Sequence, residues 1–164
     1  MLPRRQLLAA STTTLPLFLA LSACGGPDPL AGPPPLSADV RALLRAVTAE
    51  QNLISLYKRT VAVYSALAPA LTPLLADHEA HLAQLRARII EPPGKTVSTK
   101  VTSRPAIPGT RAAALAQLRT AEQAASSAQL RRLAGASPSL AQLYASIATS
   151  EATHVTVLDN GSSH

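Results

Sequence analysis

The chain has 164 residues, with 15 Lys and Arg against nine Asp and Glu, which gives a formal net charge of +6. It contains a single cysteine, so an intrachain disulfide is excluded. Tryptophan is absent, only 2% of the residues are aromatic and the basic residues are dispersed, which argues against nucleic acid as a partner.

Residues 1–23 have the layout of a secretory signal peptide. Arg4 and Arg5 give a positive start, and a modestly apolar run from Leu7 to Ala23 follows. Ser and Thr interrupt this run, whereas a transmembrane helix needs about 20 strongly apolar residues. The run ends in Leu-Ser-Ala-Cys, which resembles a bacterial lipobox. That resemblance implies cleavage before Cys24 and a lipid on its sulfur; the alternative is a free thiol behind an uncleaved anchor.

We therefore expect an exported protein that is anchored through Cys24 to the outer face of the cytoplasmic membrane. Arg4-Arg5-Gln-Leu-Leu also resembles a twin-arginine export signal, although paired arginines occur in ordinary signals. Residues 24–37 are rich in Gly and Pro, which predicts an extended tether. Without Arg4 and Arg5 the net charge is +4, which suits a surface facing anionic lipid.

Residues 38–158 are rich in Ala, Leu, Arg and Gln and are predicted to form one helical domain. Ser37 and Thr110 are placed as N-caps of the first and third helices. Residues 159–164 are expected to be a disordered tail. The first helix is expected over residues 38–67, the third over 110–134 and the fourth over 138–158. The second helix is expected to begin in the proline-containing turn at residues 68–73 and to end at residue 90.

Short links join the first helix to the second and the third to the fourth, while residues 91–109 join the second to the third. This pattern predicts an all-α fold, a four-helix bundle of two antiparallel hairpins joined by a long crossover. Nineteen extended residues span roughly 60 Å, which exceeds the length of a 20-residue helix. The connection can therefore run along the whole bundle.

Each predicted helix carries a carboxylate or imidazole in line with its apolar stripe. Three of the five glutamates and three of the four histidines of the chain fall on this pattern. A buried carboxylate is costly unless it is protonated, paired or bound to a metal. We therefore predict that these residues converge on one site inside the bundle. They are Glu50, His78, His81, Glu122, Glu151 and His154.

The spacing of these residues supports convergence. Glu50 and His81 are 31 residues apart, and Glu122 and His154 are 32 apart. Each interval is one hairpin, so the two halves place their polar groups alike. Glu151 begins a Glu-x-x-His pair, whose members face the same way on a helix and can reach the same metal.

The arrangement resembles the ferritin-like superfamily of carboxylate-bridged dimetal bundles, and more narrowly the uncharacterised ferritin-like domains of bacterial lipoproteins. That family has Glu, Glu-x-x-His, Glu and Glu-x-x-His on its successive helices, with a long crossover in the middle. Over residues 38–158 the resemblance implies iron or manganese as cofactor and iron oxidation, oxygen or peroxide handling, or metal storage as activity. It implies, by analogy, a homodimer. When the family pattern is carried over to this sequence, the resemblance implies Glu50 and Glu122 as terminal carboxylate ligands and Glu151 as a bridging carboxylate. It implies His81 and His154 as the imidazole ligands.

One position departs from the family pattern, because His78 stands where the second helix would carry its bridging glutamate. Glu79 lies about 100° round the helix and does not substitute for it, whereas Asp77 could lean in. Three carboxylates then face the four positive charges of two divalent ions, and a neutral imidazole does not usually bridge two metals. A single ion, a three-histidine site that favours zinc or copper, and a site without metal all remain open.

Each assignment also has a plainer alternative. The carboxylates of the first and third helices could pair with arginines such as Arg45 or Arg119. The two histidines of the second helix could form a hydrogen-bonded pair in the core, and the Glu-x-x-His pair could be exposed. Tyr57 and Tyr144, each two turns from a predicted ligand, are expected to be core aromatics rather than partners of the site.

Two functions follow from this sequence. The first is an exported, membrane-anchored metal-binding protein, which as an enzyme would be a metal-dependent oxidoreductase of ferritin-like type. The second is a metal-free scaffold that serves as a binding module in the cell envelope, and the replacement at His78 is its best support. A membrane-acting amphipathic protein is less well supported, since the helical stripes match one another in length. No nucleophilic triad, phosphate-binding loop or cysteine metal motif is visible in the sequence.

Overall fold

The computed structural model describes residues 35–90 and 97–161. The predicted signal peptide with Arg4 and Arg5, the lipidated Cys24 and the tether up to residue 34 lie outside the described residues. So do residues 91–96 of the connection and the last three residues of the tail. Export, lipid attachment and the domain boundaries therefore stay predictions.

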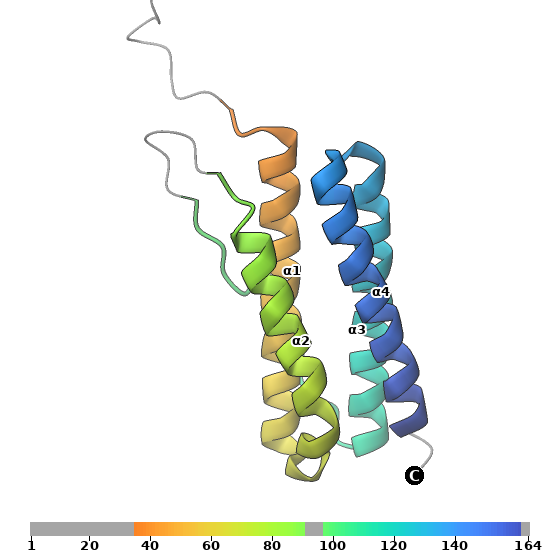
Figure 1. Ribbon diagram of the computed structural model, residues 1–164. Helices are drawn as coiled ribbons and strands as arrows, with labels where there is room; N and C mark the ends of the chain where they lie inside the picture. The colour runs from red at the N-terminus through yellow and green to blue at the C-terminus, as the bar shows by residue number, and fades with distance from the viewer. Residues whose placement is uncertain (1–34, 91–96, 162–164) are drawn as a thin grey trace, which may run out of the picture. The chain divides into compact units, whose positions relative to one another are not determined.

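The described residues form an all-α fold of four long helices in two antiparallel hairpins, as predicted (Figure 1). Most contacts between helices lie within the pairs α1–α2 and α3–α4, and short 3₁₀ turns close each hairpin. The helices are α1 Ala38–Val63, α2 Ala68–Arg86, α3 Arg111–Arg132 and α4 Pro138–Gly161, and the turns are η1 Ser65–Leu67 and η2 Leu133–Gly135.

The two predicted N-caps are confirmed. The Ser37 hydroxyl oxygen accepts a hydrogen bond from the Val40 N–H at 3.2 Å, and the Thr110 hydroxyl oxygen accepts one from the Ala113 N–H at 3.2 Å. Each side chain satisfies a backbone donor that the first turn of a helix leaves without an intrahelical partner.

The predicted ends of the first two helices are wrong by four residues. α1 ends at Val63 instead of residue 67, because the backbone of Tyr64 leaves the helical region with φ −121° and ψ 71°. α2 ends at Arg86 instead of residue 90. After Arg86 the backbone tightens into a turn, in which the N–H of Arg88 donates to the carbonyl of Leu85, and Ile90 is 82% exposed.

The connection between the hairpins runs along α1, as its length predicted. The side-chain oxygen of Asn52, in the middle of α1, accepts hydrogen bonds from the backbone N–H groups of Thr102 and Ser103. The hydroxyl of Tyr64, just after α1 ends, donates to the carbonyl of Pro108 at 2.6 Å. The chain therefore returns along the bundle before α3 starts, so α2 and α3 run in the same direction (Figure 1).

The buried apolar residues form two clusters on either side of a polar layer. We call them the first and the second cluster. The residues that α1 contributes to the first cluster follow Glu50 in the sequence, and those that it contributes to the second cluster precede Glu50. The first contains Leu53, Leu56, Tyr57, Leu67, Leu71, Leu74, Leu115, Leu118, Ala125 and Leu158. The second contains Leu43, Ala46, Val47, Leu85, Leu140, Leu143, Tyr144 and Ile147. Two dry layers thus enclose the level at which the predicted site residues lie.

No single helix among the described residues is long and apolar enough to cross a membrane. Only α1 taken together with the segment Ser65–Arg86, bent by 119°, reaches that length and composition.

Leu118→Ala should lower the free energy of unfolding by about 3 kcal/mol, because Leu118 is fully buried in the first cluster and its removal leaves a cavity. Leu130→Ala is the matched control, since Leu130 lies on the same helix but is 54% exposed. Denaturant unfolding of both variants measures the difference, and equal losses would contradict this description of the core.

Candidate metal centre

All four helices deliver the six predicted site residues to one buried layer. The side chains of Glu50 and His78 come from α1 and α2, and Glu122 and Glu151 come from α3 and α4; none of these four residues has any exposed surface. His81 is 8% exposed and His154 is 2% exposed. All six residues thus lie in one buried layer, but only five of them form groups whose ligand atoms lie close together, and Glu151 belongs to neither group. The role of all six as metal ligands stays a prediction.

His78 occupies the centre of this layer. Its Nδ1–H donates to Oε2 of Glu50 at 2.9 Å, and its Nε2–H donates to Oε1 of Glu122 at 2.7 Å. Burial alone would lower the pKa of His78, but the hydrogen bonds and charges of the two carboxylates raise it to about 10. The ring is therefore a buried imidazolium at neutral pH when no metal is bound, with both protons held by carboxylates.

Two groups of three side chains surround His78. The first triad is Glu50, His78 and His81, and the second triad is His78, Glu122 and His154; in each, one nitrogen or oxygen per residue lies within 4.8 Å of the others. Nδ1 of His81 is 3.8 Å from Oε1 of Glu50, and Nδ1 of His154 is 3.4 Å from Oε1 of Glu122. Two ligands that each lie 2.0–2.2 Å from a tetrahedral ion are about 3.4 Å apart, so both triads have the spacing of a metal site.

The layer also contains buried polar atoms that have no hydrogen-bond partner. In the first triad these are Oε1 of Glu50 and Nδ1 of His81, and in the second they are Oε2 of Glu122 and Nδ1 of His154. Both carboxyl oxygens of Glu151 also lack a donor. Buried polar atoms are almost always satisfied in proteins, so a cluster of nitrogen and oxygen atoms without hydrogen-bond partners is suited to an ion.

The carboxyl of Glu151 behaves differently from that of Glu122. Burial raises the pKa of Glu151, and the nearby charges of Glu50 and Glu122 raise it further, to about 9. Burial would also raise the pKa of Glu122, but the imidazoles of His154 and His78 lower it to about 2. Without metal, Glu151 is thus protonated at neutral pH while Glu122 is ionised.

Two neighbouring side chains, Asp77 and Tyr57, contact the residues of this layer. Nε2 of His154 is 3.2 Å from Oδ2 of Asp77 and its Nδ1 is 3.4 Å from Oε1 of Glu122, so the ring is held between two carboxylates. The hydroxyl of Tyr57 donates to Oε1 of Glu122 at 2.5 Å. Asp77 leans toward the site, as the sequence allowed, but Tyr57 was expected to be a core aromatic only, and that expectation is corrected. Its position two turns after Glu50, on the same face of α1, was the available signal.

The arginine alternative for the buried carboxylates is wrong. Glu50 and Glu122 pair with His78, whereas Arg119 forms an exposed ion pair with Asp159 at 2.5 Å. The alternative in which the Glu-x-x-His pair is exposed is also wrong, because Glu151 and His154 are buried, as the favoured interpretation expected. His78 and His81 lie edge to face, with ring centroids 5.8 Å apart, but each imidazole faces a carboxylate and no hydrogen bond joins the two rings among the described contacts.

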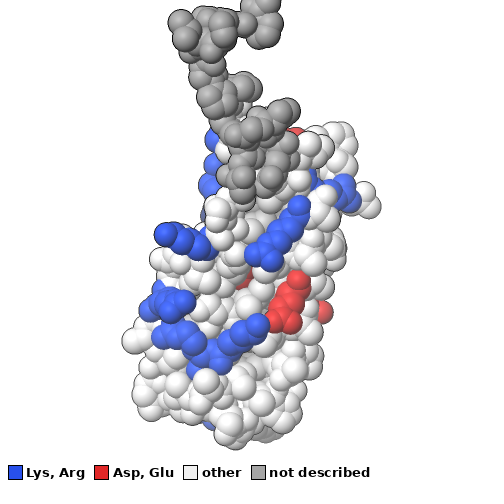
Figure 2. Space-filling view, turned by 90° about the vertical axis from the view of Figure 1, so that its left-hand side faces the viewer, with Lys and Arg blue, Asp and Glu red and all other residues white. Residues whose placement is uncertain are grey.

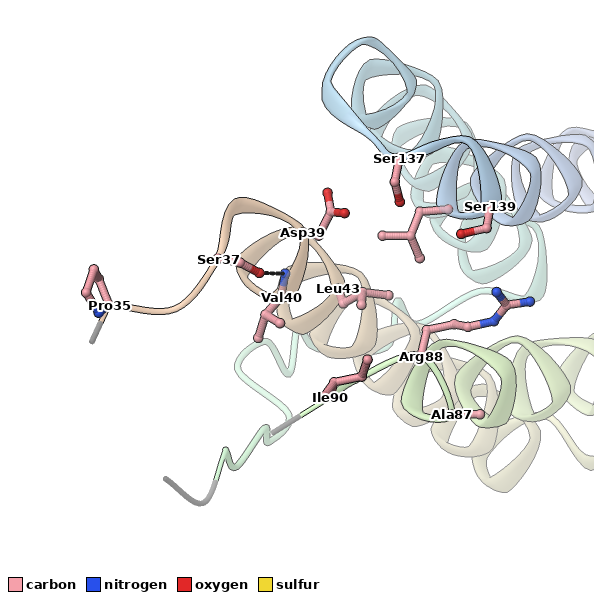
Figure 3. A pocket seen from close by; sticks show the side chains of 11 residues that line it. Pro35, Ser37, Asp39, Val40, Leu43, Ala87, Arg88, Ile90, Ser137 and Ser139 are labelled. Atoms are coloured by element: carbon pink, nitrogen blue, oxygen red, sulfur yellow. Dashed lines mark hydrogen bonds between the residues drawn. The ribbon is translucent and has the colours of Figure 1, made fainter. Parts of the chain in front are cut away.

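The surface pockets lie away from this layer. A pocket of about 660 Å³ opens where α1 and α4 begin and α2 ends, and Figure 3 shows Ser37, Arg88 and Ser139 around it. None of the six site residues lines it. Because all six side chains are buried and none lines this pocket, the layer suits an ion better than an organic molecule as an occupant.

Comparisons of the sequence with protein-family models and with curated proteins found no match, and neither did a comparison with solved structures. The assignment of this site consequently depends on the geometry above.

The metal-free protein should lose stability as the pH rises from 6.5 to 9. In the folded state His78 keeps its proton up to about pH 10 and Glu151 up to about pH 9, whereas the ordinary values are 6.5 and 4.5. The folded state therefore binds up to two more protons than the unfolded state over this interval, and each proton contributes a fall of about 1.4 kcal/mol per pH unit.

Denaturant unfolding in the presence of a chelator measures this slope. Glu151→Gln removes one of the two protons, so its slope should be shallower and its stability at pH 7 should exceed that of the parent. A parent whose stability rises over the same pH interval would contradict the assigned protonation states.

Proposed function

We propose that this protein binds metal ions inside its helical bundle, and that it is a ferritin-like protein. The observation that carries the proposal is the pair of triads, whose unpartnered carboxylate oxygens and imidazole nitrogens come from four helices and point at one another. The hairpin order and the long connection agree with the ferritin-like arrangement.

The contact between His154 and Asp77 supports the same proposal. Imidazoles that bind metals usually donate their other ring N–H to a carboxylate, which fixes the tautomer and orients the ring. Nε2 of His154 has such a carboxylate at 3.2 Å, and its unpartnered Nδ1 faces the second triad. The side chain of Asp77 is 57% exposed, so it lies at the edge of the buried layer. We propose that it orients the ring of His154 and does not bind the metal itself.

The donor set limits the metals that fit. Three carboxylates suit iron and manganese, which the ferritin-like resemblance implies, whereas three imidazoles suit zinc and copper equally well. Bound iron, manganese or copper would supply redox chemistry toward oxygen species or iron, and zinc would not. We propose a metal-dependent oxidoreductase or a metal store, with Glu50, His81, Glu122, Glu151 and His154 as ligands and His78 between them.

The proposed place of action is the cell envelope, with the chain exported by its N-terminal signal and anchored through lipid on Cys24. The surface of the bundle is compatible with a membrane carrying anionic lipid. Figure 2 shows Lys and Arg side chains spread over the face that α1, α2 and the connection form, and Lys58, Arg59, Arg86 and Arg104 line a pocket there. Such a face would be attracted to negative headgroups.

Metal analysis of the purified full chain tests the function directly. We expect a stoichiometric amount of iron, manganese, zinc or copper, and its loss in the double variant Glu151→Ala, His154→Ala, because His154 belongs to the second triad and Glu151 is buried in the same layer. A parent chain that holds none of the four metals after incubation with each would sink the proposal.

The same measurement extends to Asp77→Asn, in which the orienting carboxylate of His154 becomes a neutral amide. We expect metal affinity to fall by about 10- to 100-fold while stoichiometry is kept. Glu79→Gln is the control, since Glu79 lies two residues away on the same helix and only forms an exposed ion pair with Lys58 at 2.7 Å. An equal loss of affinity in both variants would contradict the specific role of Asp77.

A second candidate function is a metal-free ferritin-like scaffold that acts as an envelope binding module. One observation favours it: the imidazolium of His78 already fills the space between Glu50 and Glu122 and compensates their charge. In this state the hydrogen bonds of the protonated His78 ring hold the layer together, and the bundle needs no metal ion to fold.

Thermal unfolding with and without each metal separates the two functions. A metal-binding bundle gains stability with metal concentration by mass action, whereas the scaffold unfolds at the same temperature at every metal concentration.

In the metal-free state we expect Glu122→Gln to destabilise the protein by about 3 kcal/mol, since it leaves the buried His78 cation with a weaker partner. We expect Glu151→Gln to raise stability, because its carboxyl is already protonated. Destabilisation by both substitutions would count against the scaffold.

A further inference from the structure

The two ring nitrogens of His78 belong to different triads. Nδ1 faces Glu50 at 2.9 Å and Nε2 faces Glu122 at 2.7 Å, so the ring lies across the boundary between the two hairpins. Each contact is a single proton shared between a nitrogen and a carboxylate oxygen. An ion that replaces either proton meets one carboxylate and one further imidazole.

Each of the two positions is completed by a second imidazole, from His81 in the first triad and from His154 in the second. Nδ1 of His81 lies 3.8 Å from Oε1 of Glu50, and both atoms lack a hydrogen-bond partner. Nδ1 of His154, which also lacks one, lies 3.4 Å from Oε1 of Glu122. Each position therefore offers a carboxylate, an imidazole of its own and one nitrogen of His78.

The geometry points to a pair of divalent metal ions, one in each triad, bridged by the imidazolate ring of His78. This inference rests on the proposed function and adds to it the number of ions and the group that joins them. In this arrangement His78 takes the role of the bridging carboxylate, so the substitution of histidine for glutamate at this position does not remove a metal ligand.

The charges of this arrangement balance. Ionised Glu50, Glu122 and Glu151 carry three negative charges, and the imidazolate carries the fourth, against four positive charges on two divalent ions. A neutral imidazole would leave one buried positive charge uncompensated, which is costly in a dry interior. When two ions enter, the two ring protons of the His78 imidazolium and the carboxyl proton of Glu151 pass to solvent, and no electron is transferred.

Glu151 is placed to take part in this exchange. Both of its carboxyl oxygens lack a hydrogen-bond donor, and the charges of Glu50 and Glu122 act on it across the layer. The charge shortage that three carboxylates imply is removed once His78 is counted as an anion.

Titration of the metal-free full chain with Cu(II), followed by equilibrium dialysis and integration of the electron paramagnetic resonance signal, tests the bridge. An imidazolate couples the unpaired electrons of two Cu(II) ions antiferromagnetically. We expect two copper ions per chain and, at low temperature, an integrated signal far below two spins.

Variants that disable one triad should increase the signal. His81→Ala removes the imidazole that belongs to the first triad alone, and His154→Ala removes the one that belongs to the second alone. Each variant is expected to bind one copper and to recover nearly one spin per chain, so that deletion of a ligand raises the signal.

Two controls exclude other sources of the result. Glu151→Gln distinguishes the imidazolate from a carboxylate bridge, and we expect it to bind copper more weakly but to keep the suppressed signal. His164→Ala removes the histidine of the C-terminal tail, which lies outside the described residues, and reports copper bound there. Circular dichroism checks that each variant keeps its helices.

The outcomes separate this inference from the proposed function. One copper per chain in the parent overturns the inference and leaves metal binding intact. Two copper ions with a signal of two spins, or a coupling that disappears in Glu151→Gln, overturns the imidazolate bridge. Absence of bound copper overturns the inference, and the proposed function falls with it only if iron, manganese and zinc also fail to bind.

Discussion

The pair of hydrogen bonds from His78 to Glu50 and Glu122 is the constraint on which the bundle depends. One bond lies within the first hairpin, and the other crosses to α3, where contacts between helices are fewer than within each hairpin. Buried charges are tolerated only when paired, and breaking a buried pair typically costs about 3–5 kcal/mol. A sliding of one hairpin along the other would leave a cation and a carboxylate unpaired, so this contact sets their register as well as their separation.

The apolar clusters on either side explain why the polar layer has its unusual protonation. They exclude water from the level of Glu151, so burial and the neighbouring carboxylates raise its pKa to about 9. The same exclusion strengthens each interaction between ions in the layer, because the effective dielectric constant falls. The environment that makes an unpaired carboxylate costly would therefore also strengthen the attraction between this layer and a bound cation.

The sequence alone predicts which residues meet in the bundle but not how they interact. The polar interruptions of the apolar stripes, such as Glu50 and Glu122, lead to the correct buried layer because helical periodicity fixes the side on which each residue lies. The position of His78 between these carboxylates depends on the register of two hairpins, which periodicity does not determine. Tyr57 could not be distinguished from an ordinary core aromatic for the same reason. The end of α2 was misplaced because the packing beyond Leu85 depends on tertiary contacts.

The bound protons of His78 connect the two proposed functions. A bundle whose central cation is an imidazolium folds without metal, and any metal must then compete with these protons, so that affinity should increase with pH. The chain can thus be stable before it is loaded, unlike a bundle of four buried carboxylates, which needs cations for neutrality. Replacement of an oxygen donor by nitrogen at His78 also shifts the site toward metals that prefer imidazole. In the proposed metal-binding function, the same side chain would therefore stabilise the empty state and influence the choice of metal.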